Sequence, residues 1–267
     1  MEHRKEGHTE MRNPREKEVE KWSKYYQNLN SFMQPNEYLL KLLLGNYEGK
    51  KTFWKIKRKK NFLEDKDGWN NAFANLKCLD SACGDGRNIP LLSRLGFSVF
   101  ATEISDGICK KVFENVCSTG TSIPKKNIQT GFNNSLPFEN SFFDFLISWN
   151  AIYYFDHKEH EINENINEVT RVLKKGGYFI GSIPGPKCYS FLGAKKVGTH
   201  QVQINPSTNS NWGGGLQKDT FLYLIETQKH LKNVLSHQFI NIETSELYWD
   251  GFGSAPLHYF MFVAQKK

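Results

Sequence analysis

The hydrophobic and polar positions divide the chain into an N-terminal part and a main part. Residues 1–18 are polar, carry charges of both signs and have almost no apolar side chains, which predicts a disordered or frayed tail. Between residues 19 and 44, aromatic and leucine side chains recur at helical spacing on both sides of Pro35, which predicts two short helices. We therefore expect an N-terminal helical cap over residues 19–70 and a main domain over residues 71–267.

From residue 76 the pattern becomes an alternation of short apolar runs and amphipathic segments. The apolar runs predict buried strands at 76–82, 97–103, 127–131, 142–149 and 178–183. The segments between them predict helices at 88–95, 105–117 and 158–173. Ser105 has a side chain that can cap the second of these helices. Strands that alternate with helices pack as a parallel sheet, so we expect a doubly wound, mostly parallel α/β fold.

The C-terminal part departs from this alternation. Its pattern predicts a strand, a helix and two further strands, at 220–225, 226–237, 239–249 and 258–265. The last two are joined by a short glycine-rich connection, which predicts an antiparallel pair at one edge of the sheet. Residues 184–218 have no regular pattern and contain three prolines and three consecutive glycines. A loop this long often forms a lid over a substrate site, and a plain linker is the alternative.

Composition restricts the class of protein. The 267 residues are 39% hydrophobic and 24% charged, which is ordinary for a globular protein. The sequence has no uncharged apolar stretch long enough for a membrane span, and Met1 is not followed by the apolar segment of a signal peptide, so we expect a cytoplasmic protein. The five cysteines include no CxxC pair, which argues against a disulfide framework or a zinc site, and we expect no metal.

The net charge of +7 is concentrated in residues 50–60, which contain seven lysines and arginines. A solvated loop or helix face is the simplest interpretation. The alternative is an electrostatic contact with a phosphate-bearing substrate, nucleic acid or an anionic membrane surface, and charge by itself does not rank these three.

A loop of small residues between the first predicted strand and helix of the main domain is the strongest functional signal. Residues 80–86 read Asp-Ser-Ala-Cys-Gly-Asp-Gly, so small residues alternate at Ala82, Gly84 and Gly86. Small residues let a nucleotide approach the backbone closely, and N–H groups at a helix start favour its polar atoms. Dinucleotide-binding loops read GxGxxG instead, and Ile89 stands where that spacing requires the last glycine. This spacing argues against a nicotinamide or flavin cofactor.

The second predicted strand ends in Glu103, about twenty residues beyond the loop. An acid at this place in an open α/β sheet accepts hydrogen bonds from the ribose hydroxyls of a nucleotide. We therefore expect Glu103 to bind ribose.

Four segments together resemble the class I S-adenosylmethionine-dependent methyltransferases, and in particular their small-molecule, methyltransferase-11-like members. Residues 79–88, 101–105, 136–144 and 173–178 are similar to the first motif, the second motif, the "LPF…SFD" segment and the turn into the fifth strand of that family. The resemblance covers residues 76–183 and the antiparallel ending. It implies a Rossmann-like fold, S-adenosylmethionine as cofactor and methyl transfer to a small or medium-sized molecule.

The resemblance also implies roles for the residues that match the motifs. Asp80 would lie near the methionine end of the cofactor. The loop residues that would surround the cofactor are Ala82, Cys83, Gly84 and Gly86. Glu103 would hold the ribose, and Ile104 would pack on the adenine.

Two further segments complete the expected cofactor site. Phe132 stands where many family members have an acid that contacts the adenine amino group, and Asn133 is the candidate to replace that acid. The residues expected beneath the methionine part are Ser148, Trp149 and Asn150.

The cofactor carries an electrophilic methyl group, so the protein mainly aligns the reactants and excludes water. Candidates at the methyl end are Tyr153 and Tyr154, for positioning or as a base, and His200 from the lid. Three alternatives stay open: an RNA methyltransferase that uses residues 50–60, a non-catalytic S-adenosylmethionine-binding partner protein, and, disfavoured by the loop spacing, a nicotinamide dehydrogenase. The sequence identifies neither the methyl acceptor nor the oligomeric state.

Overall fold

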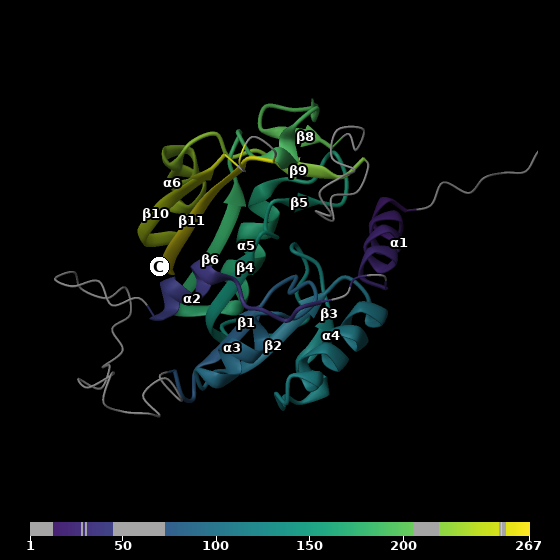
Figure 1. Cartoon of the computed structure of the whole chain (residues 1–267). Helices are drawn as coiled ribbons and strands as arrows, with labels where there is room; N and C mark the ends of the chain where they lie inside the picture. The colour runs from purple at the N-terminus through teal and green to yellow at the C-terminus, as the bar shows by residue number, and fades with distance from the viewer. Residues whose placement is uncertain are drawn as a thin grey trace, which may run out of the picture.

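A computed structural model of the chain describes most of its residues (Figure 1). The described residues are 13–27, 29, 31–44, 73–204, 219–250, 252 and 255–267. The basic run at 50–60 and the three glycines at 213–215 lie outside them. The predictions that concern these two segments are therefore not placed in the structure.

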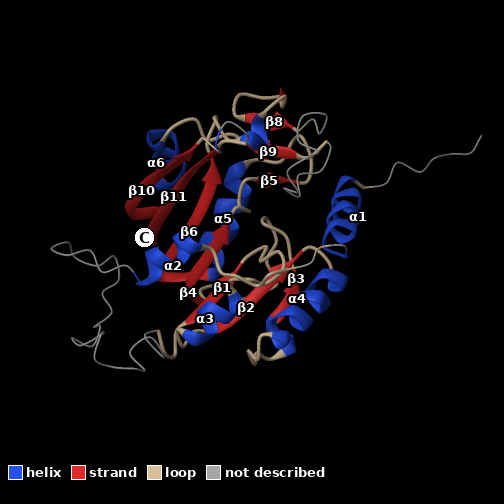
Figure 2. Cartoon of the chain, in the orientation of Figure 1, coloured by secondary structure: helices blue, strands red, loops and turns tan. Residues whose placement is uncertain are grey.

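Seven strands form the main sheet, in the order β10-β11-β6-β4-β1-β2-β3 (Figure 2). They are β1 (Lys77–Asp80), β2 (Ser98–Glu103), β3 (Ile128–Thr130), β4 (Phe143–Trp149), β6 (Leu173–Pro184), β10 (Phe239–Trp249) and β11 (Leu257–Lys266). The first five are parallel to one another, whereas β11 is antiparallel to both β6 and β10. The predicted doubly wound, Rossmann-like sheet with an antiparallel C-terminal edge is confirmed.

Helices cover both faces of this sheet. One face carries α2 (Glu37–Leu44), α3 (Ile89–Arg94) and α4 (Asp106–Ser118), and the other carries α5 (Ile162–Val172) and α6 (Gln228–Ser236). Each helix buries an apolar stripe, such as Ile162, Ile166 and Val169 on α5. Short 3-10 turns occur at Lys125–Asn127 (η1) and Tyr189–Phe191 (η2). The predicted cap of α4 is present, since the Ser105 hydroxyl accepts a hydrogen bond from Ile108 N at 3.3 Å.

The N-terminal segment forms two helices, as the apolar pattern predicts, but the first begins earlier than expected. Helix α1 (Pro14–Gln27) starts inside the stretch predicted as a tail, with a proline at a position that helices favour for their first turn. Residues 1–12 lie outside the described part. Helix α1 lies beside α4, far from β10 (Figure 1). Helix α2 instead buries Leu39 and Leu43 completely in the core of the main domain, so it is not part of a separate cap.

The segment predicted as an irregular lid contributes to a second, four-stranded sheet. Strands β7 (Lys195–Lys196), β8 (Gln201–Gln203), β9 (Phe221–Tyr223) and β5 (Tyr154–Phe155) pair in the order β5-β9-β8-β7. All three pairings are antiparallel. Strands of two or three residues are too short to show a period in the sequence, which is why the pattern indicated a loop.

The boundary between α5 and β6 also differs from the prediction. The helix predicted at 158–173 begins only at Ile162 and ends at Val172, and β6 starts directly at Leu173 instead of Tyr178. Gly176 has a φ of +75°, and a Cβ on Gly177 would lie 2.9 Å from the carbonyl oxygen of Lys174. The two glycines therefore allow an irregular start of the strand, where the sequence indicated a helix stop.

No helix within the described ranges is long and apolar enough to cross a membrane.

Candidate functional site

A cavity of about 360 Å³ opens at the carboxyl ends of the parallel strands. It lies where β1 pairs with β2 on one side and with β4 on the other, which is the position where open α/β sheets bind ligands. Its walls come from α1, the loop after β1, the end of β2, residues 131–134, residues 149–156, Tyr189 and Tyr259. The sequence predicted cofactor contacts or candidate catalytic residues in the loop after β1, at the end of β2, and within residues 131–134 and 149–156, and it predicted that the N-terminal cap and residues 184–218 would cover the site.

The loop after β1 has the conformation that its small residues permit. Ala82, Gly84 and Gly86 have φ values of 51°, 66° and 83°, all in the left-handed region. Ala82, Cys83 and Gly84 line the cavity, whereas Gly86 does not. A Cβ on Gly86 would lie 2.9 Å from a methyl group of Val112, so this glycine allows the loop to pack against α4. Gly86 therefore contributes to the packing beneath the cavity wall.

Glu103 connects the glycine loop to the end of β2. Its side chain is buried and accepts hydrogen bonds from Gly84 N at 2.7 Å and Ile104 N at 3.0 Å. Burial raises the pKa of Glu103 to about 7, although both backbone hydrogen bonds oppose that rise. A carboxylate has further lone pairs beyond these two bonds, so Glu103 can still accept hydrogen bonds from ribose hydroxyls.

Asp80 is the second buried acid beneath the loop. It is 1% exposed, its Oδ2 has no hydrogen-bond partner, and it does not itself line the cavity. Burial, reinforced by the charge of Glu103, raises the pKa of Asp80 to about 8. An unpaired buried carboxyl group favours a ligand that brings a polar partner or a positive charge near it.

The loop at residues 131–134 also lines the cavity. The amide nitrogen of Asn133 donates to Ala151 O at 2.8 Å, which leaves its buried Oδ1 without a partner. This free acceptor is the group that an adenine amino group requires. Phe132 lines the cavity too, and its ring is covered by the guanidinium of Arg15, 4.3 Å from the ring centroid.

The segment after β4 forms the remaining wall. Trp149 and Asn150 line the cavity, while Ser148 is fully buried with its hydroxyl unpaired and does not line it. Tyr153 and Tyr154 both line the cavity, and their rings stack with centroids 4.7 Å apart. Burial raises the pKa of both phenols above the usual value for tyrosine. The two tyrosines therefore stay protonated near neutral pH, which favours a role in positioning over one as a base.

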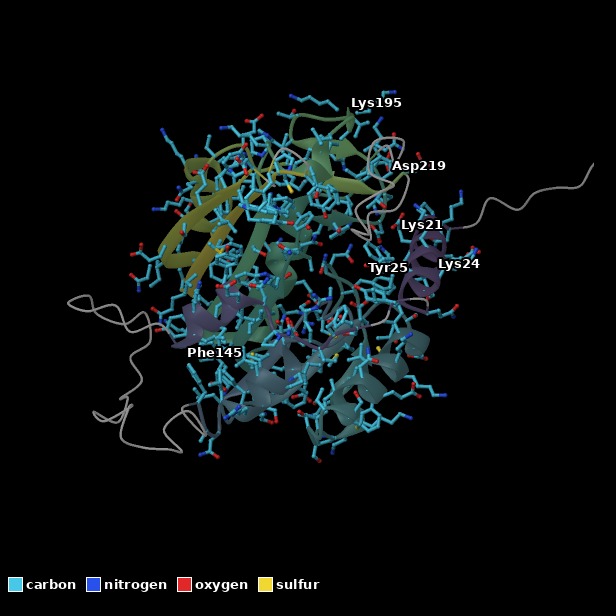
Figure 3. The ribbon with its side chains drawn as sticks, viewed as in Figure 1. Lys21, Lys24, Tyr25, Phe145, Lys195 and Asp219 are labelled. Atoms are coloured by element: carbon cyan, nitrogen blue, oxygen red, sulfur yellow. The ribbon has the colours of Figure 1, made fainter. Side chains whose placement is uncertain are left out.

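Helix α1 covers the cavity with aromatic side chains. Trp22 packs edge-on against Tyr154 with ring centroids 5.4 Å apart, and Tyr26 lies so close to the glycine loop that a Cβ on Gly84 would be 2.9 Å from its hydroxyl. Tyr25 lies on the side of α1 that faces the protein, and Lys24 on the outer side (Figure 3). The sequence left two interpretations of these aromatic residues open, a cap over the site and the packed core of an N-terminal helix, because helical spacing fits both equally well.

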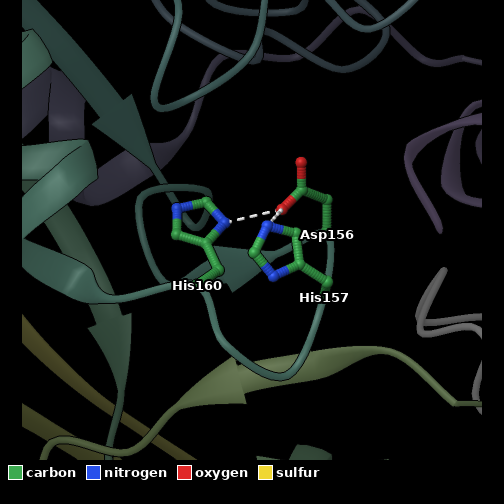
Figure 4. Close-up of side chains that lie close together, drawn as sticks. All are labelled: Asp156, His157 and His160. Atoms are coloured by element: carbon green, nitrogen blue, oxygen red, sulfur yellow. Dashed lines mark hydrogen bonds and ion pairs between the residues drawn. The ribbon is translucent and has the colours of Figure 1, made fainter. Parts of the chain in front are cut away.

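The sequence assigned none of Arg15, Asp156 and His160 to the site, although hydrogen bonds join Asp156 to the other two. His160 was expected to be an exposed helix residue, and this is wrong, because it is 4% exposed and precedes α5. Asp156, His157 and His160 each offer one ligand atom within 4.8 Å of the others (Figure 4), and so do His200, Glu226 and His230 elsewhere. His200, a candidate from the sequence, does not line the cavity. Arg15 is 141 residues from Asp156, so only the fold could reveal that contact.

Comparison with known proteins agrees with this geometry. The family model described as "Methyltransferase domain" matches residues 79–181. No curated protein matches the sequence.

Solved structures of low sequence identity share the fold. The PH0226 protein from Pyrococcus horikoshii OT3 has 21% identity and a TM-score of 0.55, over 91% of this chain and 99% of that one. An S-adenosylmethionine-dependent methyltransferase from Methanosarcina mazei has 21% identity and a TM-score of 0.52, over 72% and 92% of the two chains. The family match covers the glycine loop, Glu103 and the strands around the cavity. The chain therefore contains a methyltransferase domain over residues 79–181, in a fold that it shares with S-adenosylmethionine-dependent methyltransferases.

Proposed function

We propose that this methyltransferase binds S-adenosylmethionine in the cavity above the glycine loop and transfers its methyl group to a small molecule enclosed beneath α1. The observation that carries the proposal is the cover of aromatic side chains that α1 places over the loop and over Tyr154. The cavity, at about 360 Å³, is near the lower end of the roughly 300–1,000 Å³ of small-molecule sites. A compact acceptor suits such a space better than a macromolecular chain does.

Each residue of this site would make a separate contact with the cofactor. Ala82, Cys83 and Gly84 would surround the cofactor, Glu103 would accept hydrogen bonds from its ribose, and Asn133 Oδ1 would accept one from its adenine amino group. Three of these groups are fixed in place by the fold: the loop by its left-handed turns, Glu103 by two backbone hydrogen bonds, and Asn133 by Ala151 O. Preorganised groups lower the entropy cost of binding.

The chemistry that the bound cofactor supplies is a methyl group activated by a sulfonium. The protein's own residues exclude water and orient the acceptor. Trp22, Tyr26, Tyr153 and Tyr154 enclose the space with apolar ring faces and neutral phenol groups. An acceptor that needs no strong base, or that reaches the site already deprotonated, fits these surroundings, because no phenol here is easily ionised.

Isothermal titration with S-adenosylmethionine and NADH tests the cofactor. We expect binding of the methyl donor, weakened by Glu103→Gln and unchanged by Glu139→Gln, an exposed acid outside the cavity. Binding of NADH in place of the methyl donor would refute the proposal.

Mass spectrometry tests the acceptor. The protein is incubated with a metabolite extract and methyl-labelled S-adenosylmethionine, and a labelled small molecule is the expected product. Label found in RNA, and lost after ribonuclease treatment, would instead support the RNA methyltransferase alternative that the basic residues 50–60 raise.

A further inference from the structure

The wall that carries Tyr153 and Tyr154 is held by hydrogen bonds to its main-chain carbonyl groups. Tyr153 O accepts from Tyr223 N of β9 at 2.8 Å. Ile152 O accepts from the side-chain amide of Asn165, on α5, at 2.8 Å, and Tyr154 O accepts from the same amide at 3.4 Å. The position of the two tyrosines therefore depends on the orientation of the Asn165 amide.

That orientation determines which atoms His160 can meet. Because the Asn165 nitrogen donates to the wall, its Oδ1 is left to accept, and His160 Nε2 lies 2.8 Å from it. Asn165 and His160 are 0% and 4% exposed, and the imidazole stacks on Phe155 with centroids 4.6 Å apart. His160 Nε2 therefore carries a hydrogen and donates it to Asn165.

The other ring nitrogen of His160 faces a carboxylate. Nδ1 lies 2.8 Å from Asp156 Oδ1, and Asp156 Oδ2 accepts from Arg15 Nε at 2.9 Å (Figure 4 shows the histidine contact). Burial would raise the pKa of Asp156, but the hydrogen bonds from His160 and Arg15 outweigh it and hold that pKa well below the usual value. Asp156 thus joins Arg15 to His160, and the imidazole in turn joins Asp156 to Asn165.

The chain of contacts ends on the helix that covers the cavity. Arg15 lies in the first turn of α1 and donates through Nη2 to Asn134 Oδ1 at 3.0 Å, besides covering the Phe132 ring. Arg15 and Asp156 are 141 residues apart in sequence. An unbroken series of hydrogen bonds therefore runs from α1 through Asp156, His160 and Asn165 to the wall behind the tyrosines.

We propose that Asp156 and His160 are positioning residues of the methyl transfer, which join closure of α1 over the cavity to the placement of Tyr153 and Tyr154. When α1 lies over the cavity, Arg15 completes the charge pair on Asp156, and Asp156 in turn holds the imidazole of His160 through Nδ1. This inference rests on the proposed function in one respect, namely that methyl transfer takes place in this cavity.

Nitrogen NMR tests the hydrogen bond between His160 and Asn165 directly and needs no substrate. In protein labelled with 15N-histidine, and with the resonance assigned through His160→Gln, we expect Nε2 of His160 to carry the hydrogen that it donates to Asn165. Asp156→Asn should shift the Nδ1 resonance, because it changes the partner of that nitrogen, and His157→Gln is the control that must leave the His160 signals in place. An Nε2 without a hydrogen in the unmodified protein would overturn the series of hydrogen bonds on which the proposal rests.

Cofactor release tests the coupling to α1. Loss of the charge pair should speed dissociation of S-adenosylmethionine, followed by stopped flow, about 10-fold in either Arg15→Gln or Asp156→Asn, as expected for a partly exposed charged hydrogen bond. Since both variants break the same bond, the effect of the double variant should be smaller than the product of the two single effects. Arg15→Lys should recover part of the effect, and Lys17→Gln, the same charge change on an exposed residue of α1, should have none.

Three outcomes would overturn the proposal. They are unchanged dissociation in both single variants, additive effects in the double variant, and a loss of affinity on EDTA treatment that a divalent cation restores. The last outcome would mean that Asp156, His157 and His160 hold a metal ion. Failure of the unmodified protein to bind S-adenosylmethionine would count against the proposed function instead, while the NMR result would still decide whether His160 donates to Asn165.

Discussion

Replacing Glu103 with glutamine should change stability and cofactor binding in opposite directions at alkaline pH. The folded protein raises the pKa of Glu103 from 4.5 to about 7, mainly by burial. Between these two values the folded state binds more protons at this site than the unfolded state does, so the contribution of Glu103 to stability falls as pH rises and levels off above about 7. Each pKa unit corresponds to about 1.4 kcal/mol, so the loss amounts to about 3 kcal/mol.

Glutamine has nearly the same shape and does not titrate in this range. The free energy of unfolding of Glu103→Gln, relative to the unmodified protein, should therefore become more favourable by about 3 kcal/mol between pH 5 and pH 8. The other buried acid, Asp80, titrates in both proteins, and the comparison removes the part of its raised pKa that is due to burial, the largest cause. Loss of the Glu103 charge lowers the pKa of Asp80 and so adds to the difference in the same direction. Urea unfolding followed by circular dichroism, at both pH values and without cofactor, measures the difference.

The affinity of Glu103→Gln for S-adenosylmethionine should fall, in contrast to its stability. The amide of glutamine can accept only one of the backbone hydrogen bonds that Glu103 accepts from Gly84 and Ile104, and it loses the charge that strengthens a bond from ribose. A hydrogen bond to a charged group contributes about 1.5–3 kcal/mol, which corresponds to S-adenosylmethionine binding weakened roughly 10- to 100-fold. The reasoning would be refuted if the stability difference were equal at pH 5 and pH 8, or if the exposed control Glu139→Gln reproduced it.

Three further predictions concern the loop, the wall and the cover. Gly86→Ala should lower the free energy of unfolding by about 1–3 kcal/mol in urea titrations, because Gly86 has a positive φ and a methyl group of α4 lies close to it. The loss should be clearly larger than that of Gly120→Ala, where φ is positive but no atom lies within 4 Å of the added Cβ. Equal losses would exclude the steric cause. Tyr154→Phe should lower kcat and leave the shape of its pH profile unchanged, since the phenol stays protonated in assays near neutral pH; a lost basic limb would reveal a base. The hydroxyl oxygens of Ser23 and Ser105 are 3.1 Å apart, so cysteines at both positions can form a disulfide between α1 and the start of α4. This disulfide should slow exchange of S-adenosylmethionine at least 10-fold until it is reduced. Unchanged exchange would show that α1 need not move.

The sequence by itself determined the features that depend on neighbouring residues. The alternation of strands and helices, the alternating small residues at 82, 84 and 86, the acid at the end of β2 and the Ser105 cap are all local patterns, and all are present in the structure. These features can be predicted from the sequence because the backbone conformation of a loop or the buried face of a helix follows from a few adjacent side chains.

The tertiary structure alone decided where distant residues meet. The four-stranded sheet joins β5 to β9 across more than sixty residues of chain, and of its four short strands the sequence predicted only β9. Likewise, only the placement of α1 beside α4 brings Arg15 to Asp156 and the aromatic side chains of α1 over the glycine loop. A polar or aromatic residue on a helix fits many environments equally well in sequence, and the packing of that helix against the rest of the chain selects one of them.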